Sequence, residues 1–122
     1  MKNKFSPNVQ NEFEDIFNKI QIWKDLFDIQ LEFYHDGWAI SLKERRIYPR
    51  SIVIFKCYRK NLYSIKSFEV HPQNYKKEKF NELYFIEDIK SKKELFRELR
   101  DIIYGKDLRN HILNMCEDTF SR

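Results

Sequence analysis

The sequence is poor in glycine: Gly37 and Gly105 are the only two among 122 residues. Loops that cradle phosphate groups, such as the P-loop and the dinucleotide-binding fingerprint, need several closely spaced glycines. The sharp turn that presents a catalytic serine in α/β-hydrolases also needs them. The sequence therefore excludes these kinds of nucleotide-binding and hydrolytic site.

Cysteine and histidine are also rare, with two and three copies. Cys57 and Cys116 belong to no CxxC motif and to no cluster with histidine, so the sequence offers no recognisable zinc site. We expect both cysteines to be small apolar residues inside the fold, in a reducing compartment. No metal or cofactor is expected.

Long apolar runs are missing as well. No run approaches the roughly 20 residues that a bilayer-spanning helix needs, and the polar first ten residues lack a signal-peptide core. We therefore expect a cytoplasmic protein with no membrane partner. Aromatic residues, in contrast, are plentiful, with 11 Phe, 7 Tyr and 2 Trp. Their burial can support a folded chain, which we expect to form a single domain over 1–122.

The N-terminal part predicts one long helix. Ser6 is a suitable N-cap and Pro7 suits the first helical position. Apolar residues then recur at spacings of three and four; they are Val9, Phe13, Ile16, Phe17, Ile20, Trp23 and Phe27. We expect a helix of about five turns with this stripe, Trp23 included, in the core.

After this stripe the apolar period changes to two. Alternation on both sides of His35-Asp36-Gly37 predicts a β-hairpin over 29–44, because Asp-Gly favours a tight turn. In an alternative interpretation the first helix continues to Tyr34. Trp38 lies on the apolar period of the second strand, which favours the core, although an exposed Trp38 could anchor an interface.

Three further strands are predicted over 51–58, 62–70 and 83–86. The first is apolar on both faces at 52–55, which is typical of a central strand covered on both sides. Ser91 and Glu94 form a capping-box pattern before a helical stripe that ends near Gly105. Asp107 can cap a last helix. The sequence thus predicts an α+β fold with an antiparallel sheet of about four or five strands, one long N-terminal helix and two C-terminal helices.

Positive charge is concentrated in the middle of the chain. Residues 36–79 carry a net charge of +7, against −2 before them and −1 after them. Basic and aromatic residues are interleaved there, and the candidate contact residues are Arg45, Arg46, Tyr48, Arg50, Lys56, Tyr58, Arg59 and Lys60. Such a surface suits an acidic protein or a nucleic acid. The alternative is that these are ordinary solvated charges.

Two catalytic alternatives depend on short motifs. His35-Asp36 is similar to the His-Asp pair of metal-dependent phosphohydrolases, but no histidine precedes it. The Asp88-Ile89-Lys90 spacing, with Asp36 as a partner, is similar to a nuclease carboxylate site for a hard cation. Both patterns favour a structural interpretation. His35-Asp36 fits a hairpin turn, and Asp88-Ile89-Lys90 fits a solvated segment that leads into a helix.

The segment from Leu31 to Leu42, followed by Ile52–Phe55 and Phe68–Val70, resembles immunity proteins of bacterial polymorphic toxin and contact-dependent inhibition systems. The resemblance covers about 40 residues and consists of the aromatic-His-Asp turn between amphipathic strands. It implies a non-enzymatic protein that binds and blocks a toxin. Immunity proteins against nucleases are often acidic, whereas this chain is basic.

We therefore predict a small non-enzymatic binding protein that neutralises a protein partner by occlusion, as an immunity-type or phage-type inhibitor does. Its basic β-sheet surface would bind an acidic surface of a toxin or of a defence-complex component. The alternative is a nucleic-acid-binding protein that uses the same sheet. Reversing Arg45, Arg46 and Arg50 to Glu is expected to slow association without unfolding the chain.

Overall fold

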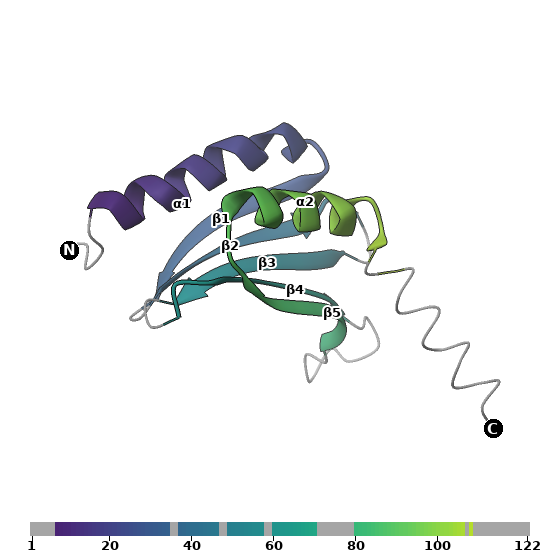
Figure 1. Cartoon of the computed structure of the whole chain (residues 1–122). Coiled ribbons are helices and arrows are strands. Elements are labelled where there is room, and N and C mark those ends of the chain that lie inside the picture. Colours follow the sequence, from purple (N-terminus) through teal and green to yellow (C-terminus); the bar gives the residue numbers. More distant parts are fainter. Residues whose placement is uncertain are drawn as a thin grey trace, which may run out of the picture.

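The computed structural model describes residues 7–34, 37–46, 49–57, 60–70, 80–106 and 108. In these ranges the chain forms a five-stranded antiparallel sheet with two α-helices, an α+β architecture (Figure 1). Each strand pairs with the next one along the chain. The elements are α1 (Pro7–Lys19), the 3-10 helix η1 (Ile20–Trp23), β1 (Phe27–Tyr34), β2 (Gly37–Glu44), β3 (Arg50–Cys57), β4 (Tyr63–Val70), β5 (Phe80–Ile89) and α2 (Lys92–Ile103).

The first helix is shorter than predicted. α1 begins at Pro7 as expected and buries Phe13 and Ile16, but it ends at Lys19 and continues only as η1. Phe27 lies four residues after Trp23, which fits a helix, yet it also starts the two-residue alternation of β1. Pairing of Phe27 with Glu44 of β2 decides in favour of the strand. The alternative helix extending to Tyr34 is wrong for the same reason.

The predicted hairpin is confirmed. Tyr34 of β1 pairs with Gly37 of β2, so the two strands are joined by a short connection. Residues 35 and 36 of this connection lie outside the described residues. A side chain at Gly37 would overlap the backbone carbonyl oxygen of Lys56 on the neighbouring strand β3. Glycine is therefore needed at this position for the close approach of β2 to β3.

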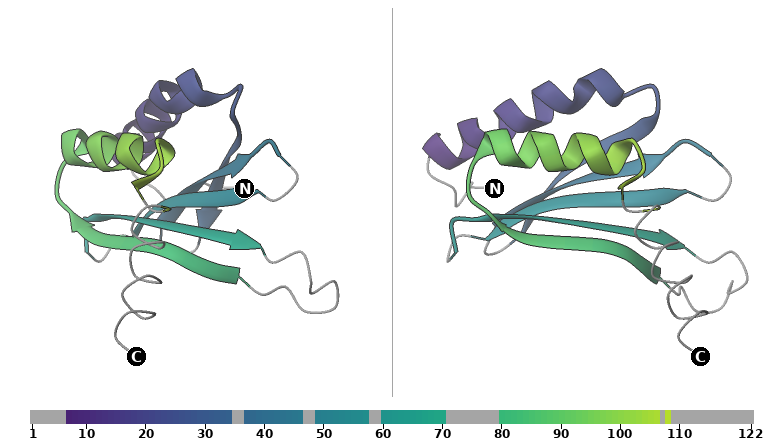
Figure 2. Two further views of the ribbon diagram at one scale, coloured as in Figure 1. Left: turned by 90° about the vertical axis from the view of Figure 1, so that its right-hand side faces the viewer. Right: turned by 45° about the vertical axis from the view of Figure 1, so that its right-hand side comes forward.

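The strand β3 is central, as predicted, because it is the third of five. The prediction that both of its faces are covered is wrong. Both described helices lie on the same face of the sheet (Figures 1 and 2). Ile52 and Ile54 are fully buried toward that face, whereas Val53 and Phe55 alternate with them and are only half-buried. The helices thus leave the second sheet face open, and we call it the open face.

The fifth strand is longer and less regular than predicted. It runs over ten residues, Phe80–Ile89, instead of 83–86. Its pairing with β4 shifts register twice, between Tyr63 and Ile65 and between Ser67 and Phe68. Asp88 has a φ of 63°, in the left-handed region. These irregularities are typical of β-bulges, which twist a strand and disturb its outer edge.

The helix α2 has the predicted caps. Ser91 Oγ accepts a hydrogen bond from the Glu94 backbone N–H at 3.2 Å. The Glu94 carboxylate in turn accepts from the Lys90 N–H at 3.5 Å. At the other end Gly105 adopts a φ of 104° and donates to the Ile102 carbonyl, which is the expected left-handed cap. The last predicted helix lies outside the described residues apart from Leu108, so one C-terminal helix is described where two were expected.

The core lies between the two helices and the sheet. Every element except β5 supplies fully buried side chains to it, and Ile89, which is 3% exposed, extends it into β5. Trp38 is buried, with its ring 5.3 Å from that of Phe13. Trp23 is half-buried against the same cluster. Both tryptophans therefore belong to the core, as their apolar periods predicted.

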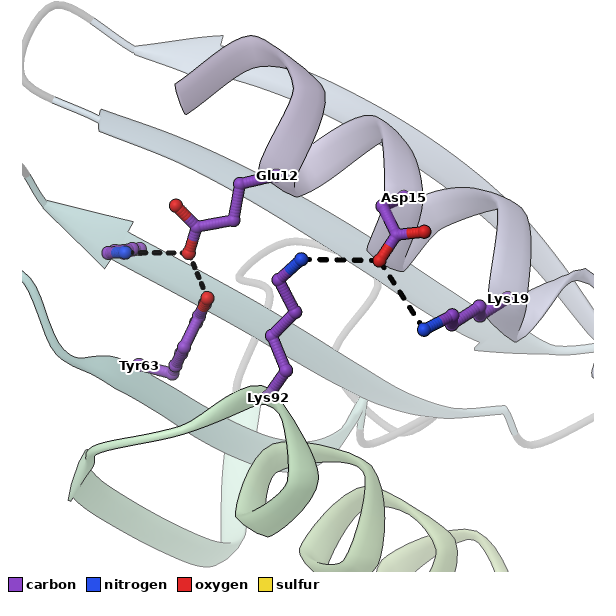
Figure 3. A network of polar contacts seen from close by, with 6 residues as sticks. Glu12, Asp15, Lys19, Tyr63 and Lys92 are labelled. Carbon is purple, nitrogen blue, oxygen red and sulfur yellow. Dashed lines mark hydrogen bonds and ion pairs between the residues drawn. The ribbon is translucent and has the colours of Figure 1, made fainter. Parts of the chain in front are cut away.

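A charged contact joins the two helices. The Asp15 carboxylate on α1 lies 3.3 Å from Lys92 Nζ at the start of α2 and 3.5 Å from Lys19 Nζ (Figure 3). The hydrogen bond from Lys92 lowers the pKa of Asp15 below its ordinary value of 3.8, and the charges of Lys19 and Lys92 act in the same direction. Burial of the carboxyl group partly opposes them.

This arrangement predicts a pH effect on stability. Because the pKa of Asp15 is lower in the folded chain, its contribution is complete above the ordinary pKa of 3.8 and is lost as pH falls through the lowered value. Asp15→Asn should therefore make the free energy of unfolding less dependent on pH below about 4. Urea unfolding between pH 2 and 6 tests this. The control is Glu87→Gln, which removes an exposed carboxylate on β5. Equal slopes for Asp15→Asn and the unmodified chain would contradict it.

Candidate partner-binding site at the arginine pocket

Three arginines that are clustered in the sequence also meet in space. They surround a pocket of about 200 Å³ at one end of the molecule, which we call the arginine pocket. At this end the turn before β1, the end of β2, the start of β3 and the end of α2 come together, on the right-hand side of Figure 1. The pocket is lined by Asp25, Leu26, Phe27, Glu44, Arg45, Arg46, Arg50 and Ile103.

Arg50 forms the inner wall of the pocket and is only 3% exposed. Its guanidinium donates to the carbonyl oxygens of Ile102 at 2.8 Å and Ile103 at 3.2 Å. These carbonyls end α2, where a helix lacks internal donors and its dipole favours a cation. Arg50 Nε lies 3.4 Å from Glu44 Oε1, and the same oxygen accepts from the Arg50 backbone N–H at 2.9 Å. Arg50 thus fixes α2 to the sheet.

Arg45 and Arg46 form the outer wall and are exposed. The Arg45 backbone N–H donates to the Leu26 carbonyl at 3.0 Å, and its Nε donates to the Lys24 carbonyl at 3.1 Å. Arg46 Nε lies 3.4 Å from Glu44 Oε1. Each arginine is therefore held at one nitrogen by a neighbouring group, which limits the rotamer entropy that binding would cost.

An apolar side chain is exposed beside these arginines. Leu26 lines the pocket and is 58% exposed, and Ile22, four residues earlier on η1, is 76% exposed. Ile103 also lines the pocket, and the adjacent Tyr104 is exposed after the end of α2. Exposed apolar side chains next to arginine are typical of the centre of a protein interface.

The charge of the pocket is weakly positive. Three arginines face two carboxylates, Asp25 and Glu44, among the residues that line it. Glu44 is engaged with Arg50 and Arg46, so its charge is matched within the wall. The chemistry available is recognition of a carboxylate by arginine beside an apolar contact, because guanidinium binds carboxylate through paired hydrogen bonds.

The other predicted contact residues lie elsewhere. Lys56 is half-buried beneath α1, with Nζ 2.6 Å from Glu12 Oε1 and 4.6 Å from the Tyr63 ring centre. The Tyr63 hydroxyl also donates to that carboxylate oxygen (Figure 3). Lys60 is exposed in the turn between β3 and β4, at the other end of the strands. Tyr48, Tyr58 and Arg59 lie outside the described residues.

The basic residues of the middle segment therefore do not gather on one sheet face. Arg50 and Lys56 share the two-residue period of Ile52 and Ile54, so they point to the helix side, where both have internal partners. Their place on the covered face is the physical reason that a uniformly basic sheet surface does not form.

The open face has a different character from the predicted basic surface. Its described charged side chains include Asp28, Glu32 and Glu82 as well as Lys43 and Lys66, as the strand pairing places them. Phe55 and Phe85 stack there with ring centres 6.3 Å apart, and Lys66 lies over the Phe85 ring. Stacked aromatics suit nucleic-acid bases, but three carboxylates against two ammonium groups repel a phosphate backbone.

The catalytic motifs are not assembled into a site by the described residues. Asp88 of the Asp88-Ile89-Lys90 motif is exposed at the irregular end of β5, and His35-Asp36 lies outside the described ranges. Within those ranges no three His, Cys, Asp or Glu side chains are grouped so that they could hold a metal ion. Cys57 is a half-buried free cysteine on β3, and Cys116 is not among the described residues.

The exposed aliphatic side chains before β1 were not predicted from the sequence. Ile22 and Leu26 are four residues apart and lie off the buried stripe of Ile20, Trp23 and Phe27. Two large aliphatic residues on the polar side of an amphipathic segment could have indicated an exposed apolar surface, because that side normally carries charge.

Comparison with protein-family models, with curated proteins and with solved structures found no match to this chain. The resemblance to immunity proteins thus stays a prediction. In the part of the chain that the structure describes, no helix has the length and the apolar character needed to cross a membrane.

Proposed function

We propose that this chain is a small non-enzymatic protein that binds a protein partner at the arginine pocket and neutralises it by occlusion, as an immunity-type or phage-type inhibitor does. The observation that carries the proposal is the exposed pair Arg45 and Arg46 beside the exposed Leu26, which line one pocket. This combination supplies an apolar anchor and a cationic rim on one end of a small fold.

The partner surface that fits this site carries a carboxylate next to an apolar side chain. A pocket of about 200 Å³ admits one side chain rather than a drug-sized ligand. Arg45 and Arg46 offer the nitrogens of their guanidinium groups that the backbone carbonyl of Lys24 and the Glu44 carboxylate do not engage. An Asp or Glu of the partner can therefore bind at the rim while its neighbour contacts Leu26.

The site is also built on a rigid base, which favours tight binding. Arg50 joins β3 to the end of α2 through two hydrogen bonds to Ile102 and Ile103. The Leu26 carbonyl accepts from the Arg45 N–H and so joins the turn before β1 to the residue that follows β2. Groups that are fixed before binding lose less conformational entropy when the complex forms.

Reversal of Arg45 and Arg46 to Glu tests the proposal. Because steering by rim charges acts on the association rate, the double variant should bind its partner at least about tenfold more slowly at low salt, with a smaller change in dissociation. Arg50 must be left out of this reversal, because a Glu there would be buried beside Glu44 and would unfold the chain. The measurement is surface plasmon resonance against the partner isolated by the unmodified protein from nuclease-treated native lysate.

A matched control is Lys93→Glu with Arg97→Glu on α2, which makes the same change in net charge at exposed positions away from the pocket. The control should retain the partner. The activity of the isolated partner, measured with and without the protein, tests neutralisation. A partner bound equally by the reversed variant, or recovery of nucleic acid alone, would contradict the proposal; nucleic-acid binding would instead weaken log-linearly with salt.

A further inference from the structure

The two edges of the sheet are protected to different extents. β1 and β5 are the outer strands, and among the described residues each pairs with a single neighbour. β5 carries two register shifts and the left-handed Asp88. Such bulges prevent a further strand from pairing along the whole edge. The edge of β5 is therefore poorly suited to adding a strand.

The edge of β1 is regular. All eight residues of β1, Phe27–Tyr34, pair with β2 in one unbroken register. The strand contains no proline, glycine or lysine, the residues that usually blunt an edge. In an antiparallel ladder every second residue of an edge strand points its N–H and C=O groups away from its partner. β1 therefore presents a regular row of backbone donors and acceptors outward.

The side chains of β1 divide into two sets. Asp28, Gln30 and Glu32 lie toward the open face and are all exposed. Ile29 and Leu31, on the helix side, are half-buried against the core. Phe33 is on the same side, 5.1 Å from the Phe13 ring and still 51% exposed. The edge thus offers an acidic row on one side and an apolar row on the other.

We propose that the edge of β1 accepts a β-strand from a protein partner, in which basic residues alternate with apolar ones. The main-chain groups of β1 would bind the added strand, and its side chains would select it. Lysine or arginine beside Asp28 and Glu32 forms favourable cross-strand pairs. An apolar residue on the other side of the added strand contacts Phe33. This surface lies apart from the arginine pocket and does not depend on the function proposed there.

A second copy of the chain fits this edge poorly. If two β1 strands pair antiparallel about Gln30, Asp28 of one copy lies opposite Glu32 of the other, and four carboxylates share one seam. Like charges opposite each other on adjacent strands destabilise the pairing. The acidic row therefore discourages self-association and favours a strand of opposite charge.

The probe is a capped nine-residue peptide in which lysine alternates with valine, titrated into the ¹⁵N-labelled full chain. We expect chemical-shift changes along β1 and slower hydrogen exchange at alternate amides of that strand, because only every second amide faces outward. A peptide of the same composition with its lysines in one block should bind at least about tenfold more weakly, since it keeps the charge but loses the alternation. This comparison needs no variant of the protein.

A pair of variants tests the charge complementarity. Asp28→Lys with Glu32→Lys changes two exposed side chains and should weaken peptide binding at least about tenfold. Glu82→Lys with Glu87→Lys makes the same charge change on β5 and should leave it within about twofold. The proposal is overturned by no binding at millimolar peptide, by shift changes centred on Phe55 and Phe85, or by equal binding of the blocked peptide.

Discussion

Replacing Arg50 with Met is expected to lower the free energy of unfolding by about 3 to 5 kcal/mol, because removing one partner of a buried ionic network leaves its neighbours without their charged donor. The guanidinium is 3% exposed and donates to the carbonyls of Ile102 and Ile103. Without it the Ile103 carbonyl loses its guanidinium donor, the Ile102 carbonyl keeps the Gly105 N–H, and Glu44 keeps only the Arg50 backbone N–H and the exposed Arg46. Methionine keeps most of the apolar packing, so the loss reports on the polar contacts.

Urea unfolding followed by circular dichroism measures this effect, with two comparison variants. Arg46→Met removes an exposed ion pair with the same Glu44 and should cost less than about 1 kcal/mol. Arg50→Lys retains the charge but cannot reach both carbonyls and Glu44 with one nitrogen, so it should recover only part of the loss. A cost below about 1 kcal/mol for Arg50→Met would show that α2 is not fixed by this residue.

Replacing Glu12 with Leu is expected to cost about 3 kcal/mol, within the range for breaking one side of a buried ion pair. Glu12 lies on α1 and accepts hydrogen bonds from Lys56 Nζ at 2.6 Å and from the Tyr63 hydroxyl on β4. Lys56 is only 11% exposed, so its ammonium group would lose its counter-charge without regaining water. Most of the expected cost of Glu12→Leu therefore comes from the Lys56 ammonium group left without a counter-charge, rather than from the lost hydrogen bond itself.

A double-mutant cycle tests this explanation. Lys56→Met added to Glu12→Leu removes the isolated ammonium, so the double variant should be more stable than Glu12→Leu alone, by about 1 to 2 kcal/mol. Both variants remove the acceptor of the Tyr63 hydroxyl, so that cost cancels in the comparison. A double variant less stable than Glu12→Leu would show that Lys56 contributes by packing rather than by charge.

Much of the fold follows from local patterns in the sequence. The alternation on both sides of Gly37 predicts the β1–β2 hairpin, and Ser91 with Glu94 predicts the start of α2. The end of α1 is less well determined, because Phe27 satisfies both the helical and the strand period. Only its pairing with Glu44 decides, and that contact joins residues 17 positions apart. The bulges of β5 depend in the same way on pairing that no local pattern reveals.

The site was predicted in part. Arg45, Arg46 and Arg50 are close in sequence and do line one pocket. The burial of Arg50 could have been inferred, because it keeps the two-residue period of Ile52 and Ile54. What the sequence does not show is why an arginine is tolerated there, since its acceptors on α2 are 52 and 53 residues away.

The order of the strands has a consequence for the chain as it is synthesised. Every strand of the sheet pairs with its successor, so the sheet can be completed progressively as the chain emerges. The helix α1 is made first, yet Asp15 meets Lys92 only after 77 further residues. At the usual 5 to 20 residues per second this takes about 4 to 15 s. Until then α2 cannot bring Leu95, Leu99 and Ile102 onto the helix side of the sheet, and the nascent chain exposes apolar sheet surface that a chaperone can bind.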